Sequence, residues 1–371
     1  MPKKFLIITE GFYPVQSPRS FRATELAKEL CRQGHEVSVM APERPNMEPL
    51  LSAYPIKFIS LGKITWVLPS IKGMGKIGAL FNKVTTRLLV WLFEYPMIEL
   101  YFKTKKKLRD EHNKYDAVIS VAVPYPIHWG VAAAWSNNKE KNVAPIWIAD
   151  CGDPYCLQEN DTFKTPFYFT WVEKWFSRKT NFITVPTQNS VKGYFPEFHS
   201  KIKVIPQGFK FEDVQLYTGE LPKEKIVFGY AGMFIPGRRD PSEFLEYINN
   251  LADHYNVEFH VYTINPQFVA PFIKDNNRII LKDLVSRETL LFELSKMNFV
   301  VNFENVGSTQ TPSKLIDYLI INKPVLSVRY GDLKPEIINE FFSGNYVHKM
   351  ELPDKERYRI QNVTNQFLEL L

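Results

Sequence analysis

The sequence is poor in cysteine. Its 371 residues include three cysteines, Cys31, Cys151 and Cys156, which cannot all pair and so do not form a disulfide framework. They form neither a CxxC motif nor a Cys/His cluster with the spacing of zinc ligands, and we predict no metal site. Free thiols are typical of a reducing compartment, which argues against a disulfide-stabilised secreted domain.

Long apolar runs are also missing. The run at residues 5–8 is shorter than the roughly 7–15 apolar residues of a signal-peptide core. The longest apolar stretch, around residues 88–98, is interrupted by Glu94 and Pro96, whereas a membrane-spanning helix needs about 20 apolar residues. We therefore predict a cytoplasmic protein.

A strong excess of one charge is absent as well. The net charge of +6 is small for 371 residues and no nucleic-acid-binding motif accompanies it, so we expect no nucleic-acid partner. Apolar residues at 45% and charged residues at 23% form an ordinary globular balance, which excludes an intrinsically disordered chain. A chain of this length fits two domains of about 150–200 residues each.

The first half of the chain alternates between apolar strands and amphipathic helices. A strand at 4–9, a helix at 20–32 closed by Gly34, and a strand at 36–40 are the opening of a doubly wound parallel sheet. We predict further strands at 117–121, 145–149, 182–185 and 202–205, with helices at 127–135 and 190–195.

A second alternation follows the polar stretch 212–220, which we interpret as a linker. We predict strands at 226–230, 258–262, 278–281, 299–302 and 325–328, and helices at 241–254, 287–294, 312–321, 335–341 and 355–371. The predicted fold is therefore α/β, with two Rossmann-like doubly wound domains, 1–212 and 221–350, facing a cleft. In the remaining segment, 351–371, the helix is expected to cross back to the first domain.

Residues 51–110 do not fit this alternation, and we interpret them as an insertion in the first domain. They hold eleven Lys and Arg residues against three acids, a net charge of +8 that exceeds the +6 of the whole chain. Bulky apolar residues such as Trp66, Trp91 and Tyr101 are interleaved with this charge. The combination suits an anionic membrane surface, where each Lys or Arg contributes about 1 kcal/mol. The alternative is an insertion packed on its own domain with a solvated basic rim.

Three strand-to-helix loops carry residues suited to binding an anion, because such loops line the ligand crevice of doubly wound sheets. The loop at 10–20 carries Arg19 at a helix start, although it lacks the GxGxxG fingerprint of dinucleotide sites. The loop at 230–242 offers two guanidinium groups, which bind a diphosphate bidentately. The loop before the helix at 312–321 offers backbone N–H groups and a lysine, and Asp317 follows one turn later, where it can accept hydrogen bonds from a ribose. Taken singly, each polar side chain also fits a solvated helix face.

The chain resembles the retaining glycosyltransferases of family 4 over essentially its whole length. The resemblance rests on the opening FLIITEGFYP…RATELAKELCRQGHEVSVMAPE, on VIPQGF at 204–209, on FGYAGMFIPGRRDP and on PSKLIDYLIINKPVL. It implies the two-domain GT-B architecture and transfer of a sugar, with retention at the anomeric carbon, from a nucleotide-diphosphate sugar to a glycan or lipid-linked glycan in polysaccharide biosynthesis. It also implies that the nucleotide sugar is a co-substrate and that neither a cofactor nor a metal ion is needed.

The resemblance also assigns candidate site residues. Arg238 and Lys314 are expected to act on the leaving diphosphate, and His128 to lie near the transferred sugar. The expected donor-binding residues are Gly232, Arg239, Thr311, Ser313 and Asp317. The expected acceptor-side residues are Arg19, Asp150 and Asp153. The alternative for His128 is a position in the core. The alternative for the two aspartates is helix capping or turn formation.

The sequence departs from the family pattern at several of these places. Asp317 stands where the family has the second Glu of its E-x7-E signature, and Thr309 stands where it has the first. Met233 replaces an arginine, and residues 16–18 replace paired glycines. Two other functions fit the same architecture. A nucleotide-sugar 2-epimerase would need no acceptor, and a non-catalytic scaffold would bind the nucleotide sugar without turnover.

Overall fold

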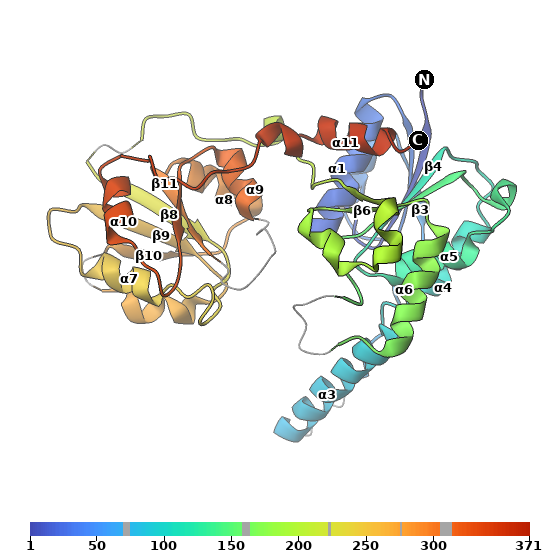
Figure 1. Cartoon of the computed structure of the whole chain (residues 1–371), viewed down its shortest axis with the longest axis horizontal. Helices are drawn as coiled ribbons and strands as arrows, with labels where there is room; N and C mark the ends of the chain where they lie inside the picture. The colour runs from blue at the N-terminus through green and yellow to red at the C-terminus, as the bar shows by residue number, and fades with distance from the viewer. Residues whose placement is uncertain (70–74, 158–163, 222–223, 275–276, 305–313) are drawn as a thin grey trace. The chain divides into compact units, whose positions relative to one another are not determined.

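The computed structural model describes residues 1–69, 75–157, 164–221, 224–274, 277–304 and 314–371. The chain divides into two compact units (Figure 1). The N-terminal domain comprises Met1–Phe209 together with Tyr358–Leu371, and the C-terminal domain comprises Lys210–Arg357.

The N-terminal domain is built on a parallel sheet of seven strands in the order β3-β2-β1-β4-β5-β6-β7. The strands are β1 (Lys4–Thr9), β2 (Glu36–Ala41), β3 (Ile56–Ser60), β4 (Ala117–Val121), β5 (Ile146–Asp150), β6 (Phe182–Val185) and β7 (Ile202–Val204). The central strands are continuous apolar runs because parallel sheets are covered on both faces. The strand order reverses between β1 and β4, which makes their carboxyl ends the topological switch point where such sheets bind ligands.

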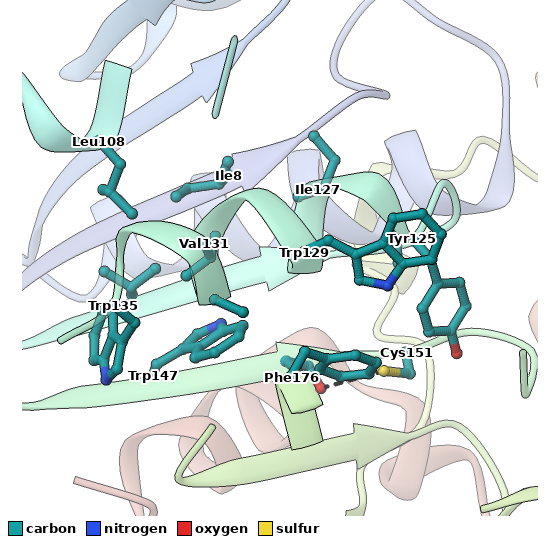
Figure 2. Close-up of a cluster of buried hydrophobic side chains, with 14 of the residues drawn as sticks. Ile8, Leu108, Tyr125, Ile127, Trp129, Val131, Trp135, Trp147, Cys151 and Phe176 are labelled. Carbon is teal, nitrogen blue, oxygen red and sulfur yellow. Dashed lines mark hydrogen bonds between the residues drawn. The ribbon is translucent and has the colours of Figure 1, made fainter. Parts of the chain in front are cut away.

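Helices cover both faces of this sheet and form two hydrophobic cores. The helices of the N-terminal domain are α1 (Pro18–Arg32), α2 (Glu48–Ala53), α3 (Gly75–Phe93), α4 (Glu99–Arg109), α5 (Pro126–Ala134), α6 (Phe167–Lys179) and α11 (Ile360–Leu368), and all of them except α3 contribute to the two cores. Leu100 of α4, Ile127 of α5 and Phe176 of α6 are buried in one core, part of which Figure 2 shows around Ile127 and Trp147. Leu26 of α1 is buried in the other.

The C-terminal helix α11 belongs to the N-terminal domain, where it lies beside α1 (Figure 1). Val363 and Phe367 of α11 are buried in the α1-side core. Gly208 permits this approach, because a Cβ atom at that position would lie 2.5 Å from Cδ1 of Ile360. The two passages between the domains fall at Phe209/Lys210 and Arg357/Tyr358.

The prediction that residues 51–110 stand outside the alternation is wrong at both ends of that segment. Its first part forms β3, an edge strand paired with β2, and its last part forms α4, which buries Leu100 and Leu108. The edge strand escaped prediction because it is only partly buried, so it lacks the continuous apolar run of a central strand. The long helix α3 extends away from the rest of the N-terminal domain (Figure 1).

Three other predictions also differ from the structure. The helix α6 was not predicted, because its aromatic residues lie on its exposed as well as its buried side and blur the helical period: Phe167 is 73% exposed and Trp171 67% exposed. Residues 189–193 form a short 3-10 helix where an α-helix was expected. In the C-terminal domain, α7 ends at Asn249 rather than at residue 254.

The C-terminal domain contains a parallel sheet of five strands in the order β10-β9-β8-β11-β12. The strands are β8 (Ile226–Ala231), β9 (Val257–Tyr262), β10 (Ile279–Lys282), β11 (Phe299–Phe303) and β12 (Val325–Val328), and the helices are α7 (Ser242–Asn249), α8 (Arg287–Ser295), α9 (Lys314–Ile321) and α10 (Pro335–Phe342). Its core is aromatic: the Phe228 ring stacks on Phe259 and Phe299 at centroid distances of 4.9 and 4.7 Å. The strand order reverses between β8 and β11.

Candidate functional site

The C-terminal domain places at its switch point the ends of the two strands that precede two of the predicted anion-binding loops. One loop follows β8 and the other follows β11, and these two strands pair with each other. Their carboxyl ends therefore lie together at one edge of the sheet, where helix N-termini and backbone N–H groups favour an anion. That the two loops serve one site stays a prediction, because residues 305–313 lie outside the described residues.

The loop after β8 is a tight turn that glycines make possible. Gly232 has a φ of +154°, and a Cβ atom there would lie 2.8 Å from the hydroxyl oxygen of Tyr230. Gly237 has a φ of +66°, and its N–H donates to the Asp240 carboxylate at 3.1 Å. A side chain at Gly232 would displace the turn, so this glycine shapes the loop.

Two guanidinium groups stand on this turn without a carboxylate partner among the described residues. Arg238 is exposed. Arg239 is half-buried, and its Nε is enclosed yet meets no hydrogen-bond acceptor in the described part of the chain. Burial raises the pKa of Tyr230 to about 12, although the positive charge of Arg239 beside it acts in the opposite direction. An anion at this turn would meet two cations for which no carboxylate partner lies among the described residues.

Asp317 lies in the first turn of α9, where its carboxylate has a partner that the sequence did not suggest. Its Oδ1 accepts hydrogen bonds from Nε and Nη2 of Arg287, the first residue of α8, at 3.1 and 2.5 Å. Burial raises the pKa of Asp317, and Arg287 opposes the shift. Arg287 is thirty positions away in sequence, and only the packing of α8 on α9 reveals the pair.

Several donor-side predictions fall outside the described residues. Thr309, Thr311 and Ser313 lie in 305–313, which the structure does not describe. Lys314 begins α9, but its side chain is not among the described side chains. Their assigned roles stay predictions.

In the N-terminal domain, two arginines at the start of α1 lie close to a buried aspartate. Arg22 donates from Nε and Nη2 to the two carboxylate oxygens of Asp150, at 3.0 and 2.8 Å. Thr184 Oγ1 donates to the same carboxylate at 2.6 Å, and Arg19 Nη1 lies 3.6 Å from it. Burial alone would raise the pKa of Asp150, but Arg22, Arg19 and Thr184 hold it below its ordinary value.

These contacts favour a structural role for Asp150, and the acceptor contact predicted for it stays a prediction. The residue is 1% exposed, and the carboxylate is already engaged by α1 and β6. Arg22 also donates to the backbone carbonyls of Ile205 and Pro206, and its guanidinium lies 5.0 Å from the Phe367 ring of α11. The cluster links α1, β5, β6, the segment after β7 and α11, which is a structural role. Arg19 remains 20% exposed at the start of α1.

His128 lies in the interior of the N-terminal domain rather than at a surface that could face a sugar. The residue is 0% exposed, with Nδ1 2.8 Å from Ser120 Oγ and Nε2 3.4 Å from Cys151 Sγ. Burial lowers its pKa to about 3, so the imidazole is neutral at physiological pH. The helix α5 is otherwise apolar, and the Phe176 ring stacks on the imidazole at a centroid distance of 5.4 Å. The role predicted for His128 near the transferred sugar stays a prediction.

Asp153, by contrast, is exposed and lines a pocket of about 290 Å³. The pocket lies beside the carboxyl ends of β4 and β5, and Trp91, Glu94 and Tyr155 also line it. Sequence reasoning did not select these three residues. The signal that was available is the position of Glu94, which interrupts the longest apolar stretch of the chain.

Metal-ligating clusters and membrane-spanning helices are not found in the described part of the chain. No three His, Cys, Asp or Glu side chains there are placed to hold a metal ion. No helix among the same residues is long and apolar enough to cross a membrane.

A comparison with known protein families identifies the family of the chain. Residues 21–212, more than half of the chain, match the model of Glycosyltransferase Family 4. The chain belongs to this family. The resemblance found in the sequence is thereby confirmed, and the chain is a glycosyltransferase by family. No curated protein matches the sequence.

Solved glycosyltransferases share the fold over nearly their whole length. A glycosyltransferase from Rickettsia africae is 12% identical, with a TM-score of 0.60 over 100% of this chain and 97% of that one. HepE from Anabaena, solved with UDP and glucose, is 12% identical, with a TM-score of 0.59 over 99% and 98%. The lipopolysaccharide outer core galactosyltransferase WaaB is 10% identical, with a TM-score of 0.55 over 99% and 98%. The predicted GT-B fold of two Rossmann-like domains is confirmed for this family 4 glycosyltransferase.

Proposed function

We propose that this family 4 glycosyltransferase moves a sugar from a nucleotide-diphosphate sugar to a glycan or lipid-linked glycan, with retention at the anomeric carbon, in the synthesis of a cell-surface polysaccharide. The observation that carries the proposal is the pair Arg238 and Arg239 at the switch point of the C-terminal domain, uncompensated among the described residues. A diphosphate is the ligand that two such guanidinium groups fit, because each binds phosphate oxygens bidentately.

The chemistry follows from where charge develops. As the bond from the sugar to the diphosphate breaks, negative charge grows on the leaving oxygen, and preorganised cations there stabilise the transition state more than the bound donor. Arg238, Arg239 and Lys314 supply this charge, and Thr311 and Ser313 are the predicted source of further hydrogen-bond donors. Attack of the acceptor hydroxyl on the face that the diphosphate leaves retains the configuration. The side-chain cations take the place that a metal ion would otherwise fill.

Asp317 holds the ribose of the donor. Its Oδ1 is engaged by Arg287, and among the described residues its Oδ2 accepts no hydrogen bond. A ribose hydroxyl that donates to Oδ2 satisfies the second oxygen of this half-buried carboxylate. Arg287 thus positions the carboxylate rather than competing with the nucleotide for it.

Thermal unfolding against UDP, GDP, ADP and CMP tests the donor site. A ligand at a hundred times its dissociation constant adds about 2.7 kcal/mol to the stability of the domain that binds it, or roughly 2–4 °C. A shift with one base supports the proposal and identifies the nucleotide. No shift with any of them contradicts it.

Turnover separates transfer from the two other functions. The matching nucleotide sugar is incubated with and without a glycan acceptor, and release of nucleoside diphosphate is measured together with sugar isomers. Acceptor-dependent release supports transfer. Isomerisation without an acceptor would indicate the epimerase, and binding without any turnover would indicate the scaffold.

The acceptor is delivered at an anionic membrane surface that α3 contacts from the cytoplasmic side. Leu80, Val84 and Leu88 of α3 are 63%, 49% and 46% exposed and recur every four residues, which aligns them on one helix face. Lys83 and Arg87 are exposed beside this stripe, and α3 contains no acidic residue. An apolar stripe flanked by cations is the pattern of a helix that lies in the membrane interface.

Co-sedimentation with vesicles tests this contact. We expect the protein to bind vesicles of phosphatidylcholine with phosphatidylglycerol, to bind pure phosphatidylcholine less, and to lose binding as salt is raised. The double variant Lys83→Gln with Arg87→Gln should weaken binding by roughly 2 kcal/mol, since each cation contributes about 1 kcal/mol. Binding that depends on neither lipid charge nor salt would refute the membrane contact and leave the transferase proposal standing.

A further inference from the structure

The pocket of about 290 Å³ in the N-terminal domain has the composition of a carbohydrate site. Its volume is at the lower end of the range of about 300–1,000 Å³ for small-molecule sites. Arg87 and Trp91 come from the end of α3, and Glu94 follows that helix directly. The segment after β4 contributes Tyr125, and the segment after β5 contributes Asp153 and Tyr155. Aromatic rings thus stand beside carboxylates at the carboxyl edge of the sheet.

Glu94 adopts a backbone conformation that is unfavourable for a residue with a side chain. It follows the last residue of α3 with a φ of +53°, in the left-handed region that glycine or asparagine adopts at helix ends with least strain. A strained non-glycine residue is retained where its side chain has a task. Here the side chain lines the pocket.

The carboxylate of Glu94 is held in place from one side. Its Oε1 accepts a hydrogen bond from the Tyr155 hydroxyl at 2.9 Å, and no described residue donates to its Oε2. Burial raises the pKa of Glu94, while the Tyr155 hydrogen bond opposes the shift. One oxygen therefore fixes the orientation of the carboxylate and the other remains available to a ligand.

The aromatic walls are fixed as well. Trp91 Nε1 donates to the backbone oxygen of Lys164 at 2.8 Å, and the Tyr125 hydroxyl donates to the backbone oxygen of Asp153 at 2.7 Å. The rings of Tyr125 and Tyr155 lie 4.8 Å apart between centroids. Side chains tied down in this way form a preorganised site, which costs little ordering on binding.

We propose that this pocket binds a neutral sugar ring of the acceptor, with Glu94 and Asp153 accepting hydrogen bonds from its hydroxyls and the aromatic rings covering its apolar face. A pyranose presents both surfaces at once, a rim of hydroxyl donors and faces of C–H groups. Two carboxylates against one guanidinium disfavour an anionic ligand. The proposal rests on the proposed transferase function, and it makes α3 a wall of the acceptor site as well as the membrane contact.

Saturation-transfer NMR on the full-length protein tests the pocket. The probes are methyl α-D-glucopyranoside, methyl α-D-galactopyranoside and methyl α-D-mannopyranoside at millimolar concentration. We expect saturation of at least one of them, and weakening by about tenfold in Glu94→Gln, because a hydrogen bond to a charged acceptor is lost. The control is Glu140→Gln, which removes an exposed carboxylate in the turn before β5, at the amino edge of the sheet.

Glu94→Gly separates binding from stability. Glycine adopts a φ of +53° without strain, so we expect this variant to unfold at the wild-type temperature or above while it loses the sugar. All seven tryptophans lie in the N-terminal domain, so tryptophan fluorescence reports its unfolding. Lower stability with unchanged sugar binding would overturn the proposal, because Glu94 would then be structural. Absence of saturation with all three probes would overturn it too.

The two proposals fail separately. Nucleotide shifts of the melting temperature that persist in Glu94→Gln, without any sugar binding, would leave the transferase function and refute the pocket. Glu94-dependent sugar binding without any nucleotide shift would do the reverse.

Discussion

The two domains treat their switch-point arginines in opposite ways. In the N-terminal domain, Arg22 is 3% exposed and both of its bonds to Asp150 are buried. In the C-terminal domain, Arg238 is exposed, and neither it nor Arg239 has a carboxylate partner among the residues that the structure describes. All of them stand at or near a helix start after a parallel strand. A compensated arginine stabilises its domain, whereas an uncompensated one is available to a ligand.

Asp150→Asn removes the negative charge that compensates Arg22, and we expect it to have the largest effect on the free energy of unfolding. The substitution leaves Arg22 buried beside a neutral group, which we expect to cost about 3–5 kcal/mol. Denaturant unfolding followed by tryptophan fluorescence measures this cost in the N-terminal domain. Wild-type stability combined with a raised KM for acceptor would show instead that Asp150 is a binding residue.

Arg238→Ala tests the uncompensated half. We expect a loss of turnover of about 10²–10³-fold, comparable to removing one transition-state donor of about 2.7–4 kcal/mol, with unfolding unchanged because the side chain is exposed. The matched control is Lys296→Ala, which removes a cation at the end of α8, just before β11 and therefore at the amino edge of the sheet, opposite both loops. Turnover that falls equally in both variants would exclude a specific role for Arg238.

Substitutions of Met233 can add a charge beside the two arginines of the C-terminal domain. It is 44% exposed, and its backbone oxygen lies 3.5 Å from Nη1 of Arg239. Met233→Glu should compensate the arginines as Asp150 does in the other domain, and weaken nucleotide binding by up to about fivefold, since an exposed pair is worth about 0.2–1 kcal/mol. Met233→Arg should strengthen binding to a similar extent. Calorimetric titration of the nucleotide measures both, and equal affinities would refute the electrostatic account.

The smallest effect concerns pH. The pKa of Asp150 is lower in the folded state, so its stabilising contribution is present above the unfolded pKa of about 3.9 and is lost as the pH falls through the folded value. Asp317 has a raised pKa, so its contribution has the opposite sign and favours the folded state as the pH falls. Tryptophan-detected unfolding from pH 5 to pH 2 should have a shallower slope in Asp150→Asn than in wild type. Identical slopes would contradict the assignment.

Much of the fold was predictable because central parallel strands are continuous apolar runs between turn signals. The strands β1, β4, β6 and β12 have the predicted bounds. The edge strand β3 and the helix α6 escaped, since partly exposed elements mix apolar and polar residues on the same side. The local sequence pattern therefore predicts an element that is buried on both faces more reliably than an element that is buried on one face.

The parts of the candidate site that depend only on residues adjacent in the chain were predictable. Gly232, Gly237 and the two arginines after them identified the turn, because glycine conformation and guanidinium charge need no distant partner. The surroundings of His128 and Asp150 could not be predicted, for the converse reason. Their roles depend on Ser120, Cys151, Arg22 and Thr184, which the fold brings to them from other elements.

The sequence by itself determined the two doubly wound domains, the family and the phosphate-suited turn, since each follows from the order of apolar runs and from residues adjacent in the chain. Only the tertiary structure decided which charged side chains are compensated. That property depends on distance and burial, and residues such as Arg22 and Asp150, 128 positions apart, meet only after the sheet has assembled. The tertiary structure also brings Glu94 and Asp153 to one pocket.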